Sequence, residues 1–141
     1  MLVSFPGYYW GGVRHDAVPG CDYMFSRWGR MVDGDGERGY GFAVRADLTH
    51  EEPIGRSFQY DPGVGGYRDT EYPDSLGPSI PADTDLEWHR ISVAVLSERY
   101  VEMVDDHVVA SGHTTLACGG LYLRVWRATA EFRDLTVTPL T

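Results

Sequence analysis

Residues 121–126 read Leu-Tyr-Leu-Arg-Val-Trp, a strict alternation of aliphatic side chains with large aromatic or charged ones. Successive side chains of a β-strand point to opposite faces of the sheet, so the three aliphatic side chains share one face. The other face then carries Tyr122, Arg124 and Trp126. This pattern predicts a strand with one side in a hydrophobic core and an aromatic, cationic surface on the other.

The same alternation recurs in two earlier segments, residues 40–47 and residues 88–96. In each segment the larger apolar side chains fall on one face, which predicts two further half-buried strands. A helix over residues 86–104 is the competing interpretation. That segment lacks an apolar stripe at i, i+3, i+4 and i+7 and is rich in β-branched residues, so a strand is favoured.

A hairpin is predicted around Asp105 and Asp106, a short polar pair between two apolar segments. Residues 130–137 form a predicted final strand, and residues 21–28 and 57–60 add two weaker ones. Seven or more short strands with turns rich in glycine and proline indicate an all-β fold. We expect an antiparallel β-sandwich or barrel, in one domain over residues 1–141.

Residues 61–85 interrupt this series of strands. Proline and glycine recur throughout the segment, and proline cannot donate to the hydrogen-bond ladder of a sheet. We therefore expect a long loop that lies over the surface or borders a groove. Long ordered loops often carry function, so this segment is a first candidate for a binding site.

The charge of the chain excludes two classes of partner. The 141 residues include 21 acidic and 12 basic side chains, for a formal net charge of -9. This charge repels a phosphate backbone and an anionic lipid surface, so no nucleic acid and no membrane is an expected partner. The first residues lack the basic and apolar regions of a secretory signal. A cytoplasmic location is the default expectation, and an extracellular one applies if a signal peptide has been removed.

The chain has two cysteines, Cys21 and Cys118. They would pair in an oxidising compartment, but free buried thiols are the more common state when cysteine is this sparse. His107, His113 and Cys118 have a spacing that zinc permits, but the set lacks a fourth ligand. We therefore favour free thiols and do not expect a zinc site.

Four segments of the C-terminal part resemble the concanavalin A-like jelly roll: residues 88–93, 101–109, 119–126 and 131–137. A strand that begins with tryptophan, a tight hairpin and a closing Phe-Arg-Asp strand follow in this order. The order is similar in particular to the laminin-G-like and 3-keto-disaccharide-hydrolase-like branch, mainly over residues 88–137. Where that family usually has glycine at the turn, this chain has aspartate, so the positive φ falls on a less favourable residue.

The resemblance implies a curved two-sheet sandwich whose concave sheet engages a sugar. Aromatic faces stack on a pyranose ring, and arginine forks orient its hydroxyls. Alternation along the predicted strands puts Arg45 and Asp47 on the face opposite the core, and Gln59 between two aromatic residues. We therefore expect a lectin-like carbohydrate-recognition module with six ligand-binding residues: Arg45, Gln59, Arg68, Tyr122, Arg124 and Trp126.

Two other classes of function stay open. A glycan hydrolase or lyase would use Asp47, Asp69 or Glu71 as a general base, with Arg68 or Arg124 stabilising developing negative charge. A protein-interaction sandwich would pair through an edge strand or its concave face, as a monomer or a homodimer. Oligosaccharide turnover and sedimentation would separate these classes from a lectin.

Residues 33–37 alternate three carboxylates with two glycines. An EF-hand loop needs glycine at its sixth position and glutamate at its twelfth, and these positions hold Arg38 and Val44. Asp33, Asp35 and Glu37 remain candidate ligands of a calcium loop of another kind, and calcium is the one cofactor considered. The alternative is a solvated hairpin turn.

Overall fold

The computed structural model describes residues 2–4, 11–49, 54–62, 65–72, 75–82 and 86–140. Within these residues the chain forms ten β-strands and no α-helix, which confirms the predicted all-β class. None of the described residues belongs to a helix long and apolar enough to cross a membrane. The strands are β1 (Leu2–Ser4), β2 (Gly11–His15), β3 (Tyr23–Asp47), β4 (Ile54–Asp61), β5 (Gly66–Tyr72), β6 (Ser75–Pro81), β7 (His89–Leu96), β8 (Arg99–Val104), β9 (His107–His113) and β10 (Gly120–Pro139).

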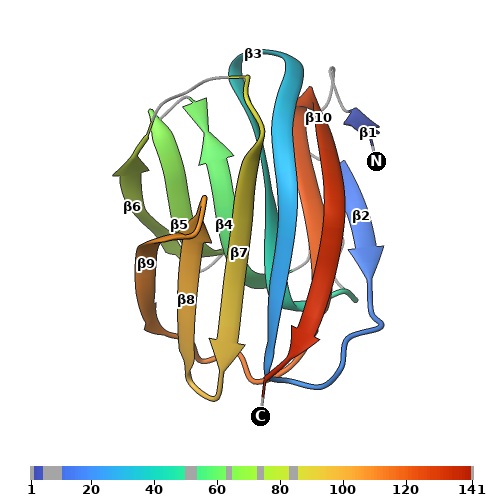
Figure 1. Ribbon diagram of the computed structural model, residues 1–141, viewed down its shortest axis with the longest axis vertical. Coiled ribbons are helices and arrows are strands. Elements are labelled where there is room, and N and C mark those ends of the chain that lie inside the picture. Colours follow the sequence, from blue (N-terminus) through green and yellow to red (C-terminus); the bar gives the residue numbers. More distant parts are fainter. Residues whose placement is uncertain are drawn as a thin grey trace.

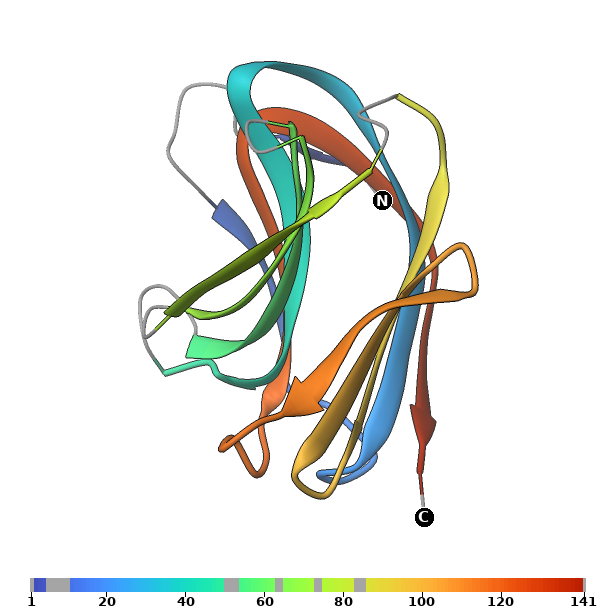
Figure 2. The ribbon, with the colours of Figure 1, turned by 90° about the vertical axis from the view of Figure 1, so that its left-hand side faces the viewer.

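Two long strands, β3 and β10, run through the whole molecule (Figure 1). They pair antiparallel along most of their length and bend together, so that each passes from one layer to the other (Figure 2). Positive φ angles at Arg127 and Asp134 coincide with register shifts in this ladder. Such β-bulges let a strand bend while its partner stays paired. The predicted strands 121–126 and 130–137 are therefore one continuous strand.

The bend divides the strands into two antiparallel layers. The first, which we call the concave sheet, has the order β6-β5-β4-β3-β10-β2 and uses the second half of β3 and the first half of β10. The second sheet has the order β9-β8-β7-β3-β10-β1 and uses the other two halves. The concave sheet bows toward the interior, so its outer face is concave (Figure 2). The predicted antiparallel sandwich is thus confirmed.

One hydrophobic core lies between the two sheets. Phe25 and Phe42 meet edge to face with ring centroids 5.0 Å apart, and Phe58 stacks on Tyr67 at 5.1 Å. The three aliphatic side chains of residues 121–126 point into this core, as the alternation predicted. Each fully buried side chain of this kind contributes roughly 1.5 to 3 kcal/mol, so the sandwich depends on this seam.

The predicted hairpin is confirmed. Val104 stands opposite His107, and Asp105 and Asp106 form the turn with φ angles of 49° and 67°. Two-residue hairpin turns with positive φ at both positions match the twist of the strands, and aspartate tolerates this region better than most residues. The helix alternative over residues 86–104 is wrong, because β7 and β8 occupy that segment.

The expectation of a surface loop over residues 61–85 is wrong. Most of the described residues there form β5 and β6, which extend the concave sheet beyond β4. Pro78 and Pro81 lie in β6, the outermost strand. A strand at an edge tolerates proline because one side of its backbone needs no partner. Proline therefore marks the edge of a sheet in this chain.

Candidate functional site

The structure distributes the predicted site residues over several places instead of one depression. Five of them share the outer face of the concave sheet, two line a cavity at one end of the sandwich, one is buried between the sheets, and one lies in an exposed turn. The five on the outer face are Gln59, Arg68, Tyr122, Arg124 and Trp126. Arg45 and Glu71 line the cavity, Asp69 is the buried residue, and Asp47 lies in the exposed turn.

Arg45 is buried, with 1% of its surface exposed, and the expectation that it lies on the outer face is wrong. Its φ angle is 48°, and the register between β3 and β4 shifts between Val44 and Asp47, which marks a β-bulge. The extra residue resets the alternation, so that Ala43 and Ala46 share the outer face. The bulge turns the Arg45 side chain to the end of the sandwich instead.

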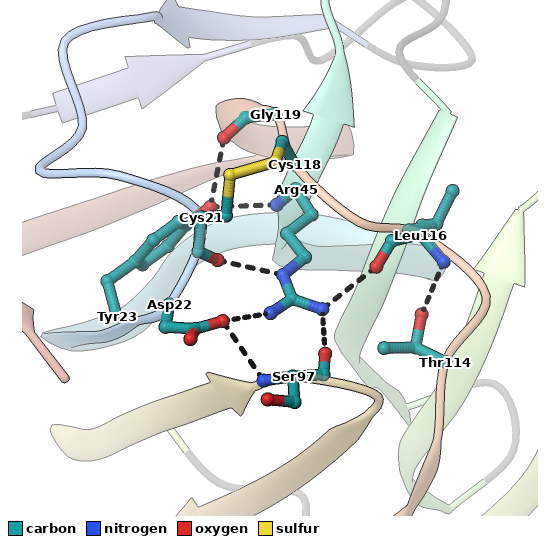
Figure 3. A network of polar contacts seen from close by, with 9 residues as sticks. All are labelled: Cys21, Asp22, Tyr23, Arg45, Ser97, Thr114, Leu116, Cys118 and Gly119. Atoms are coloured by element: carbon teal, nitrogen blue, oxygen red, sulfur yellow. Dashed lines mark hydrogen bonds and ion pairs between the residues drawn. A yellow bond between two sulfur atoms is a disulfide. The ribbon is translucent and has the colours of Figure 1, made fainter. Parts of the chain in front are cut away.

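Protein acceptors surround the Arg45 guanidinium (Figure 3). Nε donates to the carbonyl of Cys21 at 2.9 Å. Nη1 donates to the carbonyls of Ser97 at 2.6 Å and Leu116 at 2.8 Å. Nη2 pairs with the Asp22 carboxylate at 2.7 Å, and this carboxylate also accepts the Ser97 N–H at 3.0 Å. One side chain thus fixes three segments of the chain that meet here.

Cys21 and Cys118 form a disulfide, so the expectation of free thiols is wrong. Their Cα atoms lie 4.6 Å apart, although 97 positions separate them in the sequence. The start of β10 pairs with the end of β3 at Ala46, and the bend in β3 brings this end next to its start, where Arg45 bonds to Cys21 and Tyr23. Cys118, just before β10, therefore lies beside Cys21, just before β3. Pairing also removes Cys118 from the set that a zinc ion could use.

The chain after the disulfide passes close over β3 at Gly119. A Cβ atom at this position would lie 2.3 Å from the carbonyl carbon of Arg45 and 2.6 Å from the nitrogen of Ala46. The Tyr23 hydroxyl accepts the Arg45 N–H at 2.8 Å and donates to the Gly119 carbonyl at 3.3 Å. Burial raises the pKa of Tyr23, so its proton stays available for this bond. The loop is therefore held at a fixed distance from β3.

These contacts form one wall of a cavity of about 720 Å³. Glu71 at the end of β5 accepts the Thr114 hydroxyl at 2.6 Å, which orients its carboxylate. Glu98 and His113 are exposed at the margin. Carboxylate acceptors beside hydroxyl and imidazole groups suit a ligand with many hydroxyls. The remaining lining residues are Cys21, Asp22, Arg45, Ser97, Thr115, Leu116, Ala117 and Cys118.

Asp69 lies in a buried polar cluster between the sheets. It pairs with Arg56 and accepts the Tyr100 hydroxyl at 2.7 Å. The fully buried Glu102 completes the cluster, with Oε1 3.8 Å from Nε of Arg56. A general base must come within hydrogen-bond reach of the proton that it removes. Only 5% of the Asp69 surface is exposed, so a substrate cannot reach its carboxylate in this structure. Its burial does not fit the role of general base that was expected for it.

We expect Glu102→Gln to raise the melting temperature at neutral pH. Burial, and then the neighbouring Asp69, raise the pKa of Glu102 well above its ordinary value of 4.5. Ionisation therefore favours the unfolded chain, and stability falls as pH rises from 4.5 toward the folded pKa, by about 1.4 kcal/mol per pH unit.

Thermal unfolding at pH 7.5 and pH 4 checks this prediction. The variant should gain several degrees at pH 7.5 and little at pH 4, where the carboxyl group is protonated in both states. Glu98→Gln, at an exposed position, is the control and should change the melting temperature little at either pH. A Glu102→Gln protein that melts below wild type at pH 7.5 would contradict the prediction.

The outer face of the concave sheet carries five of the six predicted ligand-binding residues, all except Arg45. Arg124, Gln59 and Arg68 align in one transverse row across β10, β4 and β5, with a glycine of β3 between the first two. Trp126 lies across Gly39, where an added Cβ would be at most 2.5 Å from three indole atoms. The Arg124 guanidinium carbon lies 5.1 Å from the centre of the indole ring. Tyr122, Arg124 and Trp126 thus share a face, as the alternation predicted.

Part of this face is closed. Tyr122 was expected to expose its ring, but only 3% of its surface is accessible. The Arg14 guanidinium lies over the ring at 5.9 Å and donates to the Leu48 carbonyl at 2.5 Å. Gln59 is similarly buried, with 7% exposed. Arg68, Arg124 and Trp126 are half-buried and form the more accessible part.

The remaining candidates are carboxylates on or after β3. Asp47 accepts the N–H and the hydroxyl of Thr49 at 3.0 and 2.6 Å, in the turn that follows the strand. Across the described part of the chain, no three His, Cys, Asp or Glu side chains form a group that could hold a metal. Asp33 is exposed on β3, but the side chains of Asp35 and Glu37 lie outside the described residues. The calcium site stays a prediction.

Several polar residues of the cavity were not predicted to contact a ligand: Asp22, Glu98 and Thr114 were not named, and His113 was considered only as a zinc ligand. Each lies in or beside a connection between strands, where alternation gives no direction for a side chain. The cysteines were the one available signal, because a bond between them brings the residues beside Cys21 next to those beside Cys118. Treating the thiols as free removed that signal.

Comparisons with known proteins bear on the fold. No family model matches the chain, and no curated protein matches its sequence. The carbohydrate binding module CBM66 from Bacillus subtilis is similar with a TM-score of 0.72 and 18% identity, over 93% of this chain and 96% of that one. Sheep galectin-11 is similar with a TM-score of 0.60 and 15% identity, over 95% and 99%.

A sialidase of Trypanosoma rangeli is also similar, with a TM-score of 0.67 and 12% identity over 97% of this chain. The match covers only 25% of the sialidase, so it concerns one part of that enzyme. Identities this low establish the architecture alone. Together with the strand order, they show that this chain folds as a jelly-roll β-sandwich of the type found in CBM66 and the galectins.

Proposed function

We propose that this protein is a carbohydrate-recognition module that binds a sugar in the cavity at the disulfide-linked end of the sandwich. One observation carries the proposal: three separate segments of the chain bring Glu71, Glu98, and the neighbours His113 and Thr114 to one cavity of about 720 Å³. Small-ligand sites have volumes of roughly 300 to 1,000 Å³ and a few convergent polar groups. The likeness to a carbohydrate binding module and to galectins supports the same class of ligand.

The cavity would hold the sugar mainly through hydrogen bonds. Thr114 donates to Oε1 of Glu71, so we assign Oε2 to a sugar hydroxyl. Glu98 and His113 would contact a hydroxyl at the margin. No aromatic side chain occurs among the described lining residues, so stacking contributes little. Since each neutral hydrogen bond adds only about 0.5 to 1.5 kcal/mol net, we expect modest affinity and selection by hydroxyl geometry.

The outer face of the concave sheet is the second candidate location for the same function. The specific observation in its favour is the half-buried indole of Trp126 beside Arg124. Aromatic rings stack on the apolar face of a pyranose, and arginine donates in a fixed fork. This surface would bind a longer chain laid across the strands, whereas the cavity would take one terminal sugar.

Glycan-array retention of matched variants separates the two locations. Glu71→Gln should reduce retention roughly 10-fold or more, because hydrogen bonds to a charged group contribute about 1.5 to 3 kcal/mol. His113→Ala should reduce it less. Glu87→Gln removes an exposed carboxylate before β7, at the other end of that strand from Ser97, and should bind as wild type does. Trp126→Ala should change retention less than about twofold, because Trp126 does not line the cavity and distant sites act nearly independently.

Two outcomes would contradict the proposal. Retention lost in Trp126→Ala but kept in Glu71→Gln would place the sugar on the concave face. Absence of retention by the wild-type protein on arrays of neutral and acidic glycans would remove the function itself.

A glycan hydrolase or lyase is the second candidate function, favoured because two carboxylates, Glu71 and Glu98, line the same cavity. Cleavage of a glycosidic bond uses a pair of carboxyl groups on either side of that bond. Products released from the array oligosaccharides, and lost with Glu71→Gln, would support it. Binding without products supports the lectin-like function.

We also propose two finer points. The hairpin at Asp105 and Asp106 and a closing strand over residues 131–137 support the laminin-G-like and 3-keto-disaccharide-hydrolase-like branch of the fold. The disulfide supports an oxidising, extracellular location over the cytoplasmic default, because such bonds persist outside the reducing cytosol.

A further inference from the structure

A second cavity, of about 310 Å³, lies between the two sheets on the side of β2. The core side chains of Phe25, Leu121 and Leu123 form its floor. Val13 and Leu135 line it and are 39% and 42% exposed, so the cavity opens to solvent. Among the described residues, none lines both this cavity and the polar one. The hydrophobic core is therefore accessible from outside at this point.

The strand order explains why the core is open here. β2 pairs with β10 over residues 121–125 and has no further neighbour among the described strands. In the second sheet, β1 covers β10 over residues 129–131 and does not extend to residues 135–137. Both sheets thus end at the same side, and none of the described strands covers the apolar side chains that face each other there.

A β-bulge directs Leu135 into this opening. Asp134 has a φ angle of 55°, and the register with β3 shifts between Arg133 and Thr136. Without the extra residue, strict alternation after the buried Phe132 would point Asp134 inward and Leu135 outward. With it, Leu135 lines the cavity while Asp134 stays exposed. The bulge replaces a carboxylate with an aliphatic side chain at the mouth.

We propose that this cavity binds a small neutral molecule with one aromatic ring. Its lining is aliphatic and aromatic, and His15 is the one polar side chain among the described lining residues. A charged ligand would lose its hydration without an ion pair in return. Cavities lined by leucine and phenylalanine side chains can bind a single aromatic ring. The volume of about 310 Å³ lies at the lower end of the range for ligand sites, which favours a small molecule.

The imidazole of His15 gives the site a preference that can be measured. A phenol carries a hydroxyl group that can hydrogen-bond to an imidazole nitrogen, whereas toluene has the same ring without that group. We therefore expect p-cresol to bind more tightly than toluene. One neutral hydrogen bond contributes about 0.5 to 1.5 kcal/mol, which corresponds to roughly 2- to 12-fold in affinity.

Methyl NMR titration of the full chain with p-cresol and with toluene tests the proposal. Saturable shifts of the Leu121, Leu123 and Leu135 methyl groups are expected. Leu135→Trp should fill the cavity and weaken p-cresol binding at least about tenfold. Leu96→Trp places the same ring at another exposed leucine, 46% accessible at the end of β7, and should bind p-cresol as wild type does. His15→Ala should lower the affinity for p-cresol and leave toluene unchanged.

Val13→Phe narrows the mouth of the cavity from β2, across from Leu135. It is tested instead of Leu135→Trp if the Leu135 variant does not fold. Shifts that do not saturate would overturn the proposal. So would equal p-cresol binding by wild type, Val13→Phe and Leu135→Trp. Glycan retention is measured on the same proteins. Its loss or survival is independent of this result, because the two cavities have no described lining residue in common.

Discussion

Replacing Arg45 with methionine is expected to lower the free energy of unfolding by roughly 3 to 5 kcal/mol, because each acceptor left without its donor costs about 1 to 3 kcal/mol. The guanidinium satisfies three backbone carbonyls and the Asp22 carboxylate. Methionine fills a similar space but donates no hydrogen bond. Each acceptor left without a donor then loses its hydration with nothing in return.

Urea unfolding followed by tryptophan fluorescence measures this effect. Arg99→Met, at an exposed position on β8, is the matched control and should change stability by less than about 0.5 kcal/mol. The Arg45 variant should also lose glycan retention, because the residues that Arg45 holds form one wall of the cavity. If the free energy of unfolding of Arg45→Met stays within about 1 kcal/mol of wild type, well short of the expected loss, the segments around Arg45 are held by other contacts.

Removing the disulfide is expected to destabilise the protein by a similar amount, about 4 to 5 kcal/mol in the chain-entropy model for a loop of this length. The loop between Cys21 and Cys118 spans 97 positions and contains most of the strands. Cross-linking it restricts the unfolded chain far more than a local bond would. The double variant Cys21→Ser and Cys118→Ser is compared with wild type in urea, with and without a reducing agent.

The reducing agent should lower the stability of wild type to that of the double variant and leave the double variant unchanged. Combining the serine variants with Arg45→Met should give less than the sum of the two losses. Both changes release the same two connections, and neighbouring sites do not act additively. Strict additivity would contradict the idea that Arg45 and the disulfide hold one structural unit.

The parts of the fold that followed from local alternation were predictable from the sequence. Residues 121–126 and the Asp105 hairpin appear where expected, because side-chain period and turn chemistry act within a few residues. The β-bulges did not follow, since the residue that adopts positive φ is decided by how β3 and β10 bend together. Arg45 is an example: it was predicted to lie on an outer face, but an unpredicted bulge places it in a buried site.

The sequence predicted several residues of the candidate site, but not which of them lie together. Glu71 and Arg45 were named and do line one cavity, whereas Trp126 and Arg124 lie on another surface. Connections between strands supply much of the cavity wall, and their proximity depends on contacts far apart in the sequence. Alternation cannot report such contacts, and the one covalent sign of them was the cysteine pair.

The pairing of β3 with β10 also has a consequence for how the domain is made. The last strand in sequence is the central partner of the third, so neither sheet is complete until the end of the domain has been synthesised. Non-local strand pairing of this kind slows folding to milliseconds or longer. During translation the aromatic first half of the chain therefore waits without its partner, and its survival depends on protection against aggregation until β10 arrives.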